Sequence, residues 1–227
     1  MFTKLPRWVE VGAFWLAAIA GAVNAIGLLG FRHQAVSHLT GTSTWLSLTL
    51  VGADLGESLH LFGVLLAFVL GAALSGVIIG DAVLRLGRRY SVALLIEAAL
   101  LLAAMLALMR GSTSGHFLAS AACGLQNGMV STYSGAAIRT THVSGLFTDL
   151  GTMLGARLRG HAMDRRKAVL YLLLIVGFIL GGCVGALGFQ QMQFAALAIP
   201  AAGAAALALL YWVYRYRSMA AGKAAQP

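Results

Sequence analysis

Two short runs of polar residues and glycine have the composition of a single ligand site, because each is a near copy of the other. His38-Leu39-Thr40-Gly41-Thr42 recurs 104 residues later as His142-Val143-Ser144-Gly145-Leu146. Histidine gains or loses a proton near neutral pH, and hydroxyl groups and bare glycine backbone offer hydrogen-bond donors at close range. The paired runs therefore predict a site for a small polar or anionic solute.

A second matched pair lies upstream of the first. Gly21-Ala22-Val23-Asn24-Ala25 resembles Gly124-Leu125-Gln126-Asn127-Gly128, with Asn24 and Asn127 103 residues apart. Amide side chains carry both donors and acceptors, which suits a desolvated polar ligand. Two matched pairs at nearly the same spacing indicate an internal duplication, and transporter folds form their ligand sites where two such halves meet.

The elements that carry these motifs must lie in a bilayer. Of 227 residues, 59% are hydrophobic and 10% are charged, and the mean hydropathy is +0.85. Soluble domains carry about 25% charged residues. The net charge of +9 resides almost wholly in short loops and at the termini. We therefore expect lipid headgroups, and not nucleic acid, as the partner of these charges.

The hydrophobic pattern predicts eight helices. The second and the sixth are shorter than the ~20 residues that cross a hydrocarbon core, and therefore suit half-helices. The predicted ranges are 8–30, 40–53, 58–80, 91–109, 115–134, 144–156, 168–188 and 193–214.

Charge placement decides the topology. If all eight helices crossed, the basic loops at Arg85–Arg89 and Arg157–Lys167 would lie on opposite sides, against the positive-inside rule. Two re-entrant short helices remove the conflict. The prediction is a single all-α polytopic membrane domain over residues 1–227, with six transmembrane helices and two re-entrant half-helices. Both termini are then cytoplasmic, and 215–227 is a basic cytoplasmic tail.

Three spans per half is an odd number, so the two repeats must have inverted topology. Repeat 1 covers about 8–109 and repeat 2 about 115–214. Stripes of small residues in the third and seventh helices support the duplication, because small residues let helix backbones approach closely. These stripes are Ala67, Gly71 and Ser75, and Gly177, Gly181 and Gly185.

The half-helices are expected to meet at mid-membrane. The nine residues 31–39 reach up to ~30 Å when extended, and the midplane is ~15 Å from either face. Thr40 and Ser144 would cap the two N-termini, whose unpaired N–H groups and partial positive charge favour an anion. Alternatively, these groups merely satisfy one another. The candidate binding residues are Asn24, His38, Thr40, Gly41, Thr42, Gln126, Asn127, His142, Ser144 and Gly145.

Two acidic residues are candidates for a proton relay. Glu97 lies about 12 Å inside the bilayer, where an ionisable group suggests function; the alternative is a protonated carboxyl bonded to a neighbouring helix. Asp149 shares a helix face with His142, and it either relays protons with that residue or pairs with Arg139 or Arg157.

The motifs resemble those of the YoaK-like family of uncharacterised bacterial multi-pass membrane proteins. The matching segments are Gly21–Ala25, Ser37–Thr42, Gly124–Asn127 and Arg139–Gly145. Asn24 replaces a family aspartate, and Thr42 and Ser144 replace a family asparagine and threonine. The resemblance implies the bacterial cytoplasmic (inner) membrane and no established activity. Losing the carboxylate at position 24 weakens any proton- or cation-coupling role there.

Three functional hypotheses follow. The first is a transporter or channel for a small polar or anionic solute. The second is an intramembrane hydrolase in which histidine activates Ser144 or Ser37. The third is a non-catalytic scaffold or sensor. The sequence lacks the usual hydrolase, metal and nucleotide fingerprints, so we expect no catalytic residue, metal or cofactor. A homo-oligomer is possible.

Overall fold

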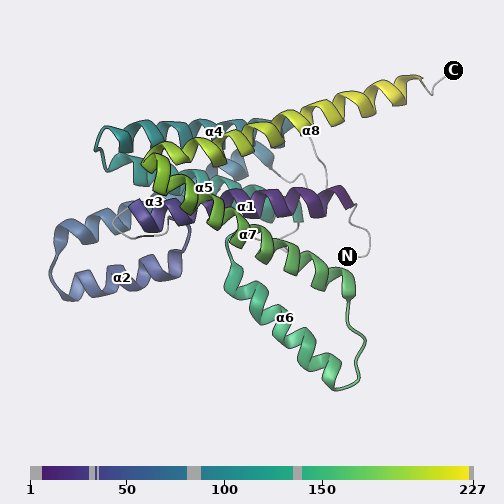
Figure 1. Cartoon of the computed structure of the whole chain (residues 1–227), viewed down its shortest axis with the longest axis horizontal. Coiled ribbons are helices and arrows are strands. Elements are labelled where there is room, and N and C mark those ends of the chain that lie inside the picture. The colour runs from purple at the N-terminus through teal and green to yellow at the C-terminus, as the bar shows by residue number, and fades with distance from the viewer. Residues whose placement is uncertain (1–6, 31–33, 35, 81–87, 135–139, 225–227) are drawn as a thin grey trace.

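Eight α-helices and one short 3-10 helix make up the computed structural model, which describes residues 7–30, 34, 36–80, 88–134 and 140–224 (Figure 1). The all-α prediction is confirmed, and each predicted helix is present. The helices are α1 (Arg7–Gly30), α2 (Leu39–Val51), α3 (Leu55–Ile79), α4 (Arg88–Met109), α5 (Ser114–Ser134), α6 (Val143–Leu158), α7 (Arg165–Met192) and α8 (Ala198–Ala224), with η2 (Gln193–Leu197) between the last two.

The last helix departs most from its predicted range. α7 ends before Gln193, which has a φ of 52°, and the 3-10 helix η2 separates it from α8. Pro200 lies in the first turn of α8, where its missing N–H costs nothing, whereas deeper inside a continuous helix it would clash with the preceding turn. α8 then continues to Ala224, so most of the predicted tail is helical. Arg85 and Arg139, used in the sequence predictions, lie outside the described residues.

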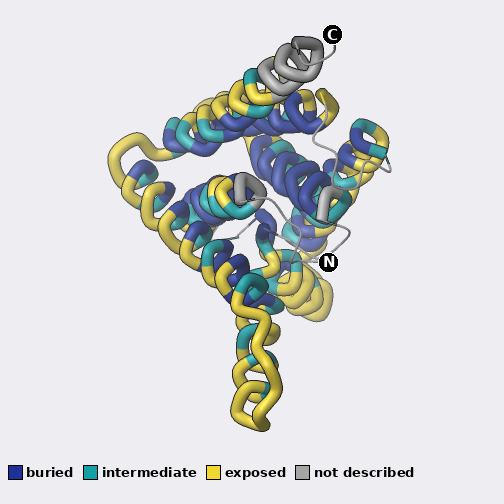
Figure 2. The backbone as a smooth tube through the Cα atoms, turned by 90° about the vertical axis from the view of Figure 1, so that its right-hand side faces the viewer, coloured by how far each residue is buried: buried dark blue, intermediate teal, exposed yellow. Residues whose placement is uncertain are grey.

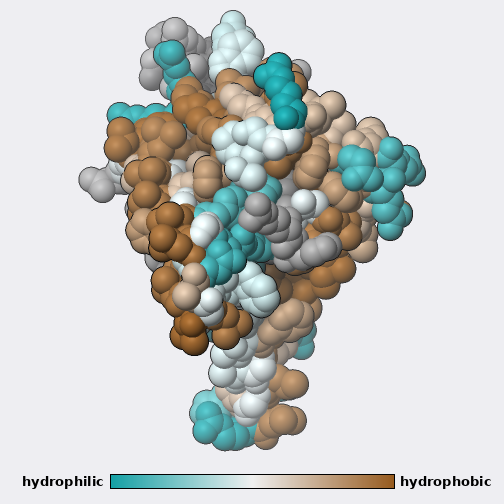
Figure 3. Space-filling view, turned by 90° about the vertical axis from the view of Figure 1, so that its left-hand side faces the viewer, coloured by the Kyte–Doolittle hydropathy of each residue, from teal (hydrophilic) through white to brown (hydrophobic). Residues whose placement is uncertain are grey.

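Apolar helices long enough to cross a membrane dominate the described chain. Four stretches qualify by length and composition: 10–30, 55–79, 88–109 and 165–214, the last of which covers α7, η2 and α8. Apolar side chains accordingly cover much of the surface seen in Figure 3. α5 does not qualify, because it carries polar residues such as Ser120 and Gln126 that are buried inside the bundle.

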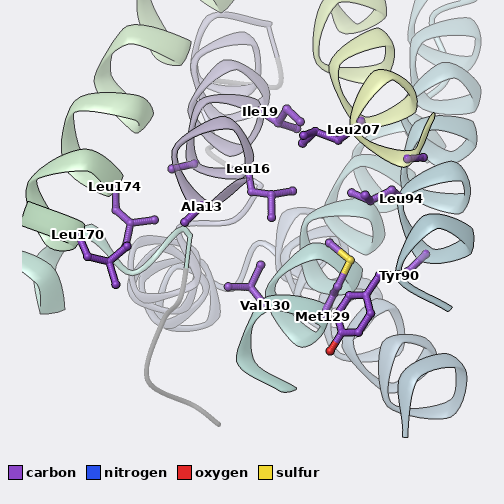
Figure 4. Packing of buried hydrophobic residues seen from close by; sticks show 14 of the residues in the cluster. Ala13, Leu16, Ile19, Tyr90, Leu94, Met129, Val130, Leu170, Leu174 and Leu207 are labelled. Carbon is purple, nitrogen blue, oxygen red and sulfur yellow. The ribbon is translucent and has the colours of Figure 1, made fainter. Parts of the chain in front are cut away.

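Helices from the two halves of the chain pack against each other. α1 packs most extensively against α7, and α3 packs against α5 to almost the same extent. α4 lies against α5 and α8. One apolar core cluster joins Leu16 of α1, Leu94 of α4, Met129 of α5, Leu174 of α7 and Leu207 of α8 (Figure 4).

Four glycines make the closest helix crossings, and the contacts form two matched pairs. A Cβ atom at any of them would overlap a backbone carbonyl of the crossing helix, so only glycine fits. The contacts are Gly21 with Phe178, Gly124 with Phe68, Gly181 with Ala18, and Gly71 with Ala121.

Each crossing in one helix pair therefore has a counterpart in the other. The partners on α1 and α5 are 103 residues apart, and those on α3 and α7 are 110 residues apart. The small-residue stripes predicted in α3 and α7 therefore contain Gly71 and Gly181, which make two of these close contacts.

The two short helices lie at the edge of the bundle. α2 packs against α3 and α6 packs against α7. Thr42 is the buried residue of α2 and Leu146 that of α6. Figure 2 shows a largely exposed segment projecting from the bundle, which Figure 1 identifies as the α6 region. From near the middle of the bundle, α2 and α6 run toward opposite ends (Figure 1).

A matched pair of variants on α3 tests the crossing. Gly71→Ala should destabilise the protein by about 1–3 kcal/mol, because the added methyl group overlaps the Ala121 carbonyl. Gly76→Ala, with nothing within 4 Å of the added atom, should be neutral or up to about 1 kcal/mol stabilising. Thermal unfolding in detergent measures both changes. Equal effects of the two substitutions would contradict the crossing.

Candidate ligand cavity

A cavity of about 610 Å³ lies at the N-terminal ends of α2 and α6. His38, Leu39 and Thr40 line it from α2, and the segment that begins at His142 lines it from α6. The two motifs, 104 residues apart in the chain, therefore meet around one space. The other lining residues are Asn24, Leu28, Ser37, Phe68, Ala72, Asn127, Gly128, Ser131, Thr141, Val143, Ser144 and Phe178.

The first residues of both short helices belong to this lining. Leu39 and Thr40 open α2, and Val143 and Ser144 open α6. N–H groups in the first turn have no acceptor within their own helix, and they carry the positive end of the helix dipole. Two such ends at one cavity make its lining favourable for a group with acceptor oxygens.

Histidine, and not the hydroxyl residue, occupies each N-cap position. His38 precedes α2 and His142 precedes α6, and neither side chain makes a capping hydrogen bond. The predicted capping role of Thr40 and Ser144 is therefore wrong, because each helix begins one residue earlier than expected. Both hydroxyl residues lie instead in the first turn, on the cavity wall.

The glycine of each motif lies beneath its histidine ring. A Cβ atom at Gly41 would lie 2.5 Å from Cδ2 of His38, and one at Gly145 would lie 2.8 Å from Cε1 of His142. The missing side chain therefore makes room for the imidazole. From the sequence, these glycines were expected to leave the backbone open to a ligand. The group that approaches each of them is instead the histidine three positions earlier in the chain.

Asn24 fastens the segment that leads into α2. Its Nδ2 donates to Oγ of Ser37 at 2.5 Å, and its Oδ1 accepts from the backbone N–H of Ser37 at 3.2 Å. Gly21, one turn earlier on α1, makes the crossing with α7. The same turn of α1 thus packs the two halves together and holds the start of the short helix.

Asn127 plays the corresponding part in α5. Its Oδ1 accepts from Oγ1 of Thr141 at 3.0 Å, and its Nδ2 donates to the carbonyl of Cys123 at 3.0 Å. Gly124, one turn earlier, makes the equivalent crossing with α3. Both asparagines line the cavity, but much of their hydrogen-bonding capacity is used within the protein.

Four of the ten predicted binding residues do not line the cavity. Gly41 and Gly145 lie beneath the histidine rings. Oγ1 of Thr42 donates to the His38 carbonyl within its own helix. Gln126 is buried, and its Nε2 donates to the carbonyl of Leu16 and to Oγ1 of Thr140. Gln126 therefore joins α1 to the segment before α6.

Four notable lining residues were not among the predicted binding residues. Ser37 and Thr141 directly precede the motif histidines, and this position was a usable signal. Phe68 and Phe178 had no such signal in the sequence, because single aromatic residues are common in apolar helices. Each lies where a crossing glycine of the other half approaches its backbone.

Neither proton-relay candidate lines the cavity. Glu97 on α4 is 1% exposed, and its Oε2 has no hydrogen-bond partner among the described atoms. Its described ionisable neighbour is Cys123 of α5. Asp149 accepts a hydrogen bond from the hydroxyl of Tyr171, which links α6 to α7. Arg139, the alternative partner suggested for Asp149, lies outside the described residues.

Comparison with known proteins gives a family without an assigned activity. No curated protein and no solved structure matches the chain. Residues 12–210 match the family described as "Protein of unknown function (DUF1275)". This match includes every residue that lines the cavity and agrees with the uncharacterised family expected from the motifs, while the narrower YoaK-like assignment stays a prediction. The chain belongs to the DUF1275 family.

Proposed function

We propose that the protein is a transporter or channel for a small polar or anionic solute, which binds in the cavity between α2 and α6. One observation supports this proposal most directly. The N-terminal ends of two short helices, from motifs 104 residues apart, line a single cavity to which both contribute a histidine and a hydroxyl residue. Such irregular backbone is tolerated at membrane depth only where it is buried in protein or lines a water-filled space.

The chemistry of the cavity favours an anion over a cation. Its described lining includes no aspartate or glutamate, and it includes two histidines and two hydroxyl residues in first turns of helices. Helix N-termini attract negative charge, and hydroxyl groups add donors. A cation would meet the positive ends of both helix dipoles without a compensating carboxylate.

We further propose six spans and two re-entrant half-helices in two inverted repeats, with both termini in the cytoplasm of a bacterium. The matched glycine crossings support the duplication, because contacts between α1 and α7 recur between α5 and α3. The directions of α2 and α6, toward opposite ends of the bundle, support the inversion (Figure 1). In this arrangement the cavity lies near the repeat interface, as in other inverted-repeat transporters.

The hydrolase and scaffold hypotheses receive less support. Oγ of Ser37 accepts a hydrogen bond from Asn24, and no described hydrogen bond joins Ser37 or Ser144 to a histidine. Activation of a serine nucleophile depends on such a bond to a base. A scaffold role gives no reason for two helix N-termini from different halves of the chain to line one cavity.

Flux measurements on glycine variants test the proposed site. Purified protein in proteoliposomes should conduct at least one member of a panel of small inorganic and organic anions. Gly41→Ala and Gly145→Ala should each lower that flux at least tenfold, because the new methyl group displaces the imidazole above it. Gly151→Ala on α6 is the matched control, since nothing lies within 4 Å of its added atom. Normal flux in both motif variants would refute the site.

Glu97 and Asp149 are proposed to carry protons during this transport. Burying a carboxylate without a cationic partner costs several kcal/mol, so Glu97 is held neutral and would ionise only when the surrounding helices move. Asp149 is fixed on α6 by Tyr171, within the helix that leads away from the cavity.

Replacing Glu97 with a neutral residue of similar shape separates an effect on proton coupling from an effect on folding. Glu97→Gln should insert and fold normally, because it replaces a neutral carboxyl with a neutral amide of similar shape. We expect flux in this variant to lose its dependence on an imposed proton gradient. Asp149→Asn gives the second arm of the experiment. Retention of gradient dependence in both variants would exclude these two residues as the coupling sites.

A further inference from the structure

A second hollow lies at the end of the α1/α7 helix pair, and its lining, unlike that of the ligand cavity, is mostly charged. Its volume is about 470 Å³, and it is lined by Glu10 of α1 and by Arg165, Arg166 and Val169 of α7. It is therefore a charged depression with one apolar wall, where two long membrane helices end.

The acidic groups at this end already have partners. Nε of Arg166 donates to Oε1 of Glu10 at 3.1 Å, with both side chains partly exposed. Asp164 caps α7 by accepting the backbone N–H groups of Arg166 and Lys167. The guanidinium of Arg165 is exposed beside this neutralised pair, so the hollow carries a net positive charge.

The apolar wall continues along α7 away from the charges. Val169, Leu172, Val176 and Ile179 are each about half exposed. Their spacing of three or four residues places them on one face of the helix, where they form a continuous stripe. The stripe begins at the hollow itself, because Val169 belongs to both.

We propose that this hollow binds the phosphate headgroup of an anionic phospholipid, with the acyl chains lying along the stripe on α7. Arginine matches phosphate oxygens with two parallel N–H donors, and basic pockets between membrane helices select anionic lipids. A free phosphate ion would use the charges but leave the apolar stripe unexplained. The combination of a basic hollow and an apolar track identifies an amphiphile.

Lipid binding to the full-length protein tests this site independently of transport. Protein in detergent is titrated with phosphatidylglycerol, with phosphatidylcholine or with inorganic phosphate, and bound lipid is counted by native mass spectrometry. We expect phosphatidylglycerol to bind, phosphatidylcholine to bind more weakly, and inorganic phosphate to give no competition at millimolar concentration. Arg165→Gln should weaken phosphatidylglycerol binding about fivefold, the loss expected for one basic side chain at an anionic lipid surface.

Arg159→Gln is the matched control, because Arg159 is an exposed arginine beyond the end of α6 that does not line the hollow. It should change phosphatidylglycerol binding by less than twofold. Equal losses in the two variants would mean diffuse attraction to basic loops and would overturn the proposal. Competition by inorganic phosphate would also overturn it, since the site would then recognise an ion. Retention of phosphatidylcholine binding by Arg165→Gln checks that this variant is folded.

Discussion

The backbones of α1 and α7, and those of α3 and α5, touch where they cross, and these two contacts determine how the other helices are placed. The crossings need glycine because the backbones touch, and packing replaces the hydrophobic driving force that helices lack inside a lipid bilayer. In each pair the crossing glycine precedes an asparagine by three residues: Gly21 and Asn24, Gly124 and Asn127. The glycine sets the distance between the halves, and the asparagine holds the start of a short helix against them.

The cavity is a consequence of this arrangement. Asn24 binds Ser37 and Asn127 binds Thr141, so each anchor lies immediately before the histidine that begins a short helix. Two helix ends are thereby held at the same place, although they come from different halves of the chain. The first turns of both short helices therefore line one space, and helix N-termini are favourable places for a group with acceptor oxygens.

Much of the fold could be predicted because hydrophobic run length in a membrane protein follows directly from bilayer thickness. That rule identified all eight helices, whereas the boundary at Pro200 depended on local backbone geometry. α5 shows the limit of hydropathy, since its buried Ser120 and Gln126 serve neighbouring helices. The repeated motifs located the cavity because duplication is visible in sequence.

The structural role of each individual residue in the motifs could not be predicted from the sequence. Side-chain type alone did not reveal that Gly41 accommodates His38 or that Gln126 binds the carbonyl of Leu16, because both depend on three-dimensional contacts. Phe68 and Phe178 were missed for the same reason. The chemistry of the residues identified the segments that form the site. Packing determines which residues of those segments line the cavity.

Cross-linking across the cavity tests whether the two helix ends share one anion site. Cysteines replace Thr40 and Ser144 in full-length protein whose own Cys123 and Cys183 are alanine, and a short bifunctional maleimide is applied in native membranes. Intramolecular cross-linking that a conducted anion suppresses is the predicted result, because both positions line one cavity. Absence of the cross-link, or a cross-link that no anion in the flux panel suppresses, would contradict a shared anion site at the two helix ends.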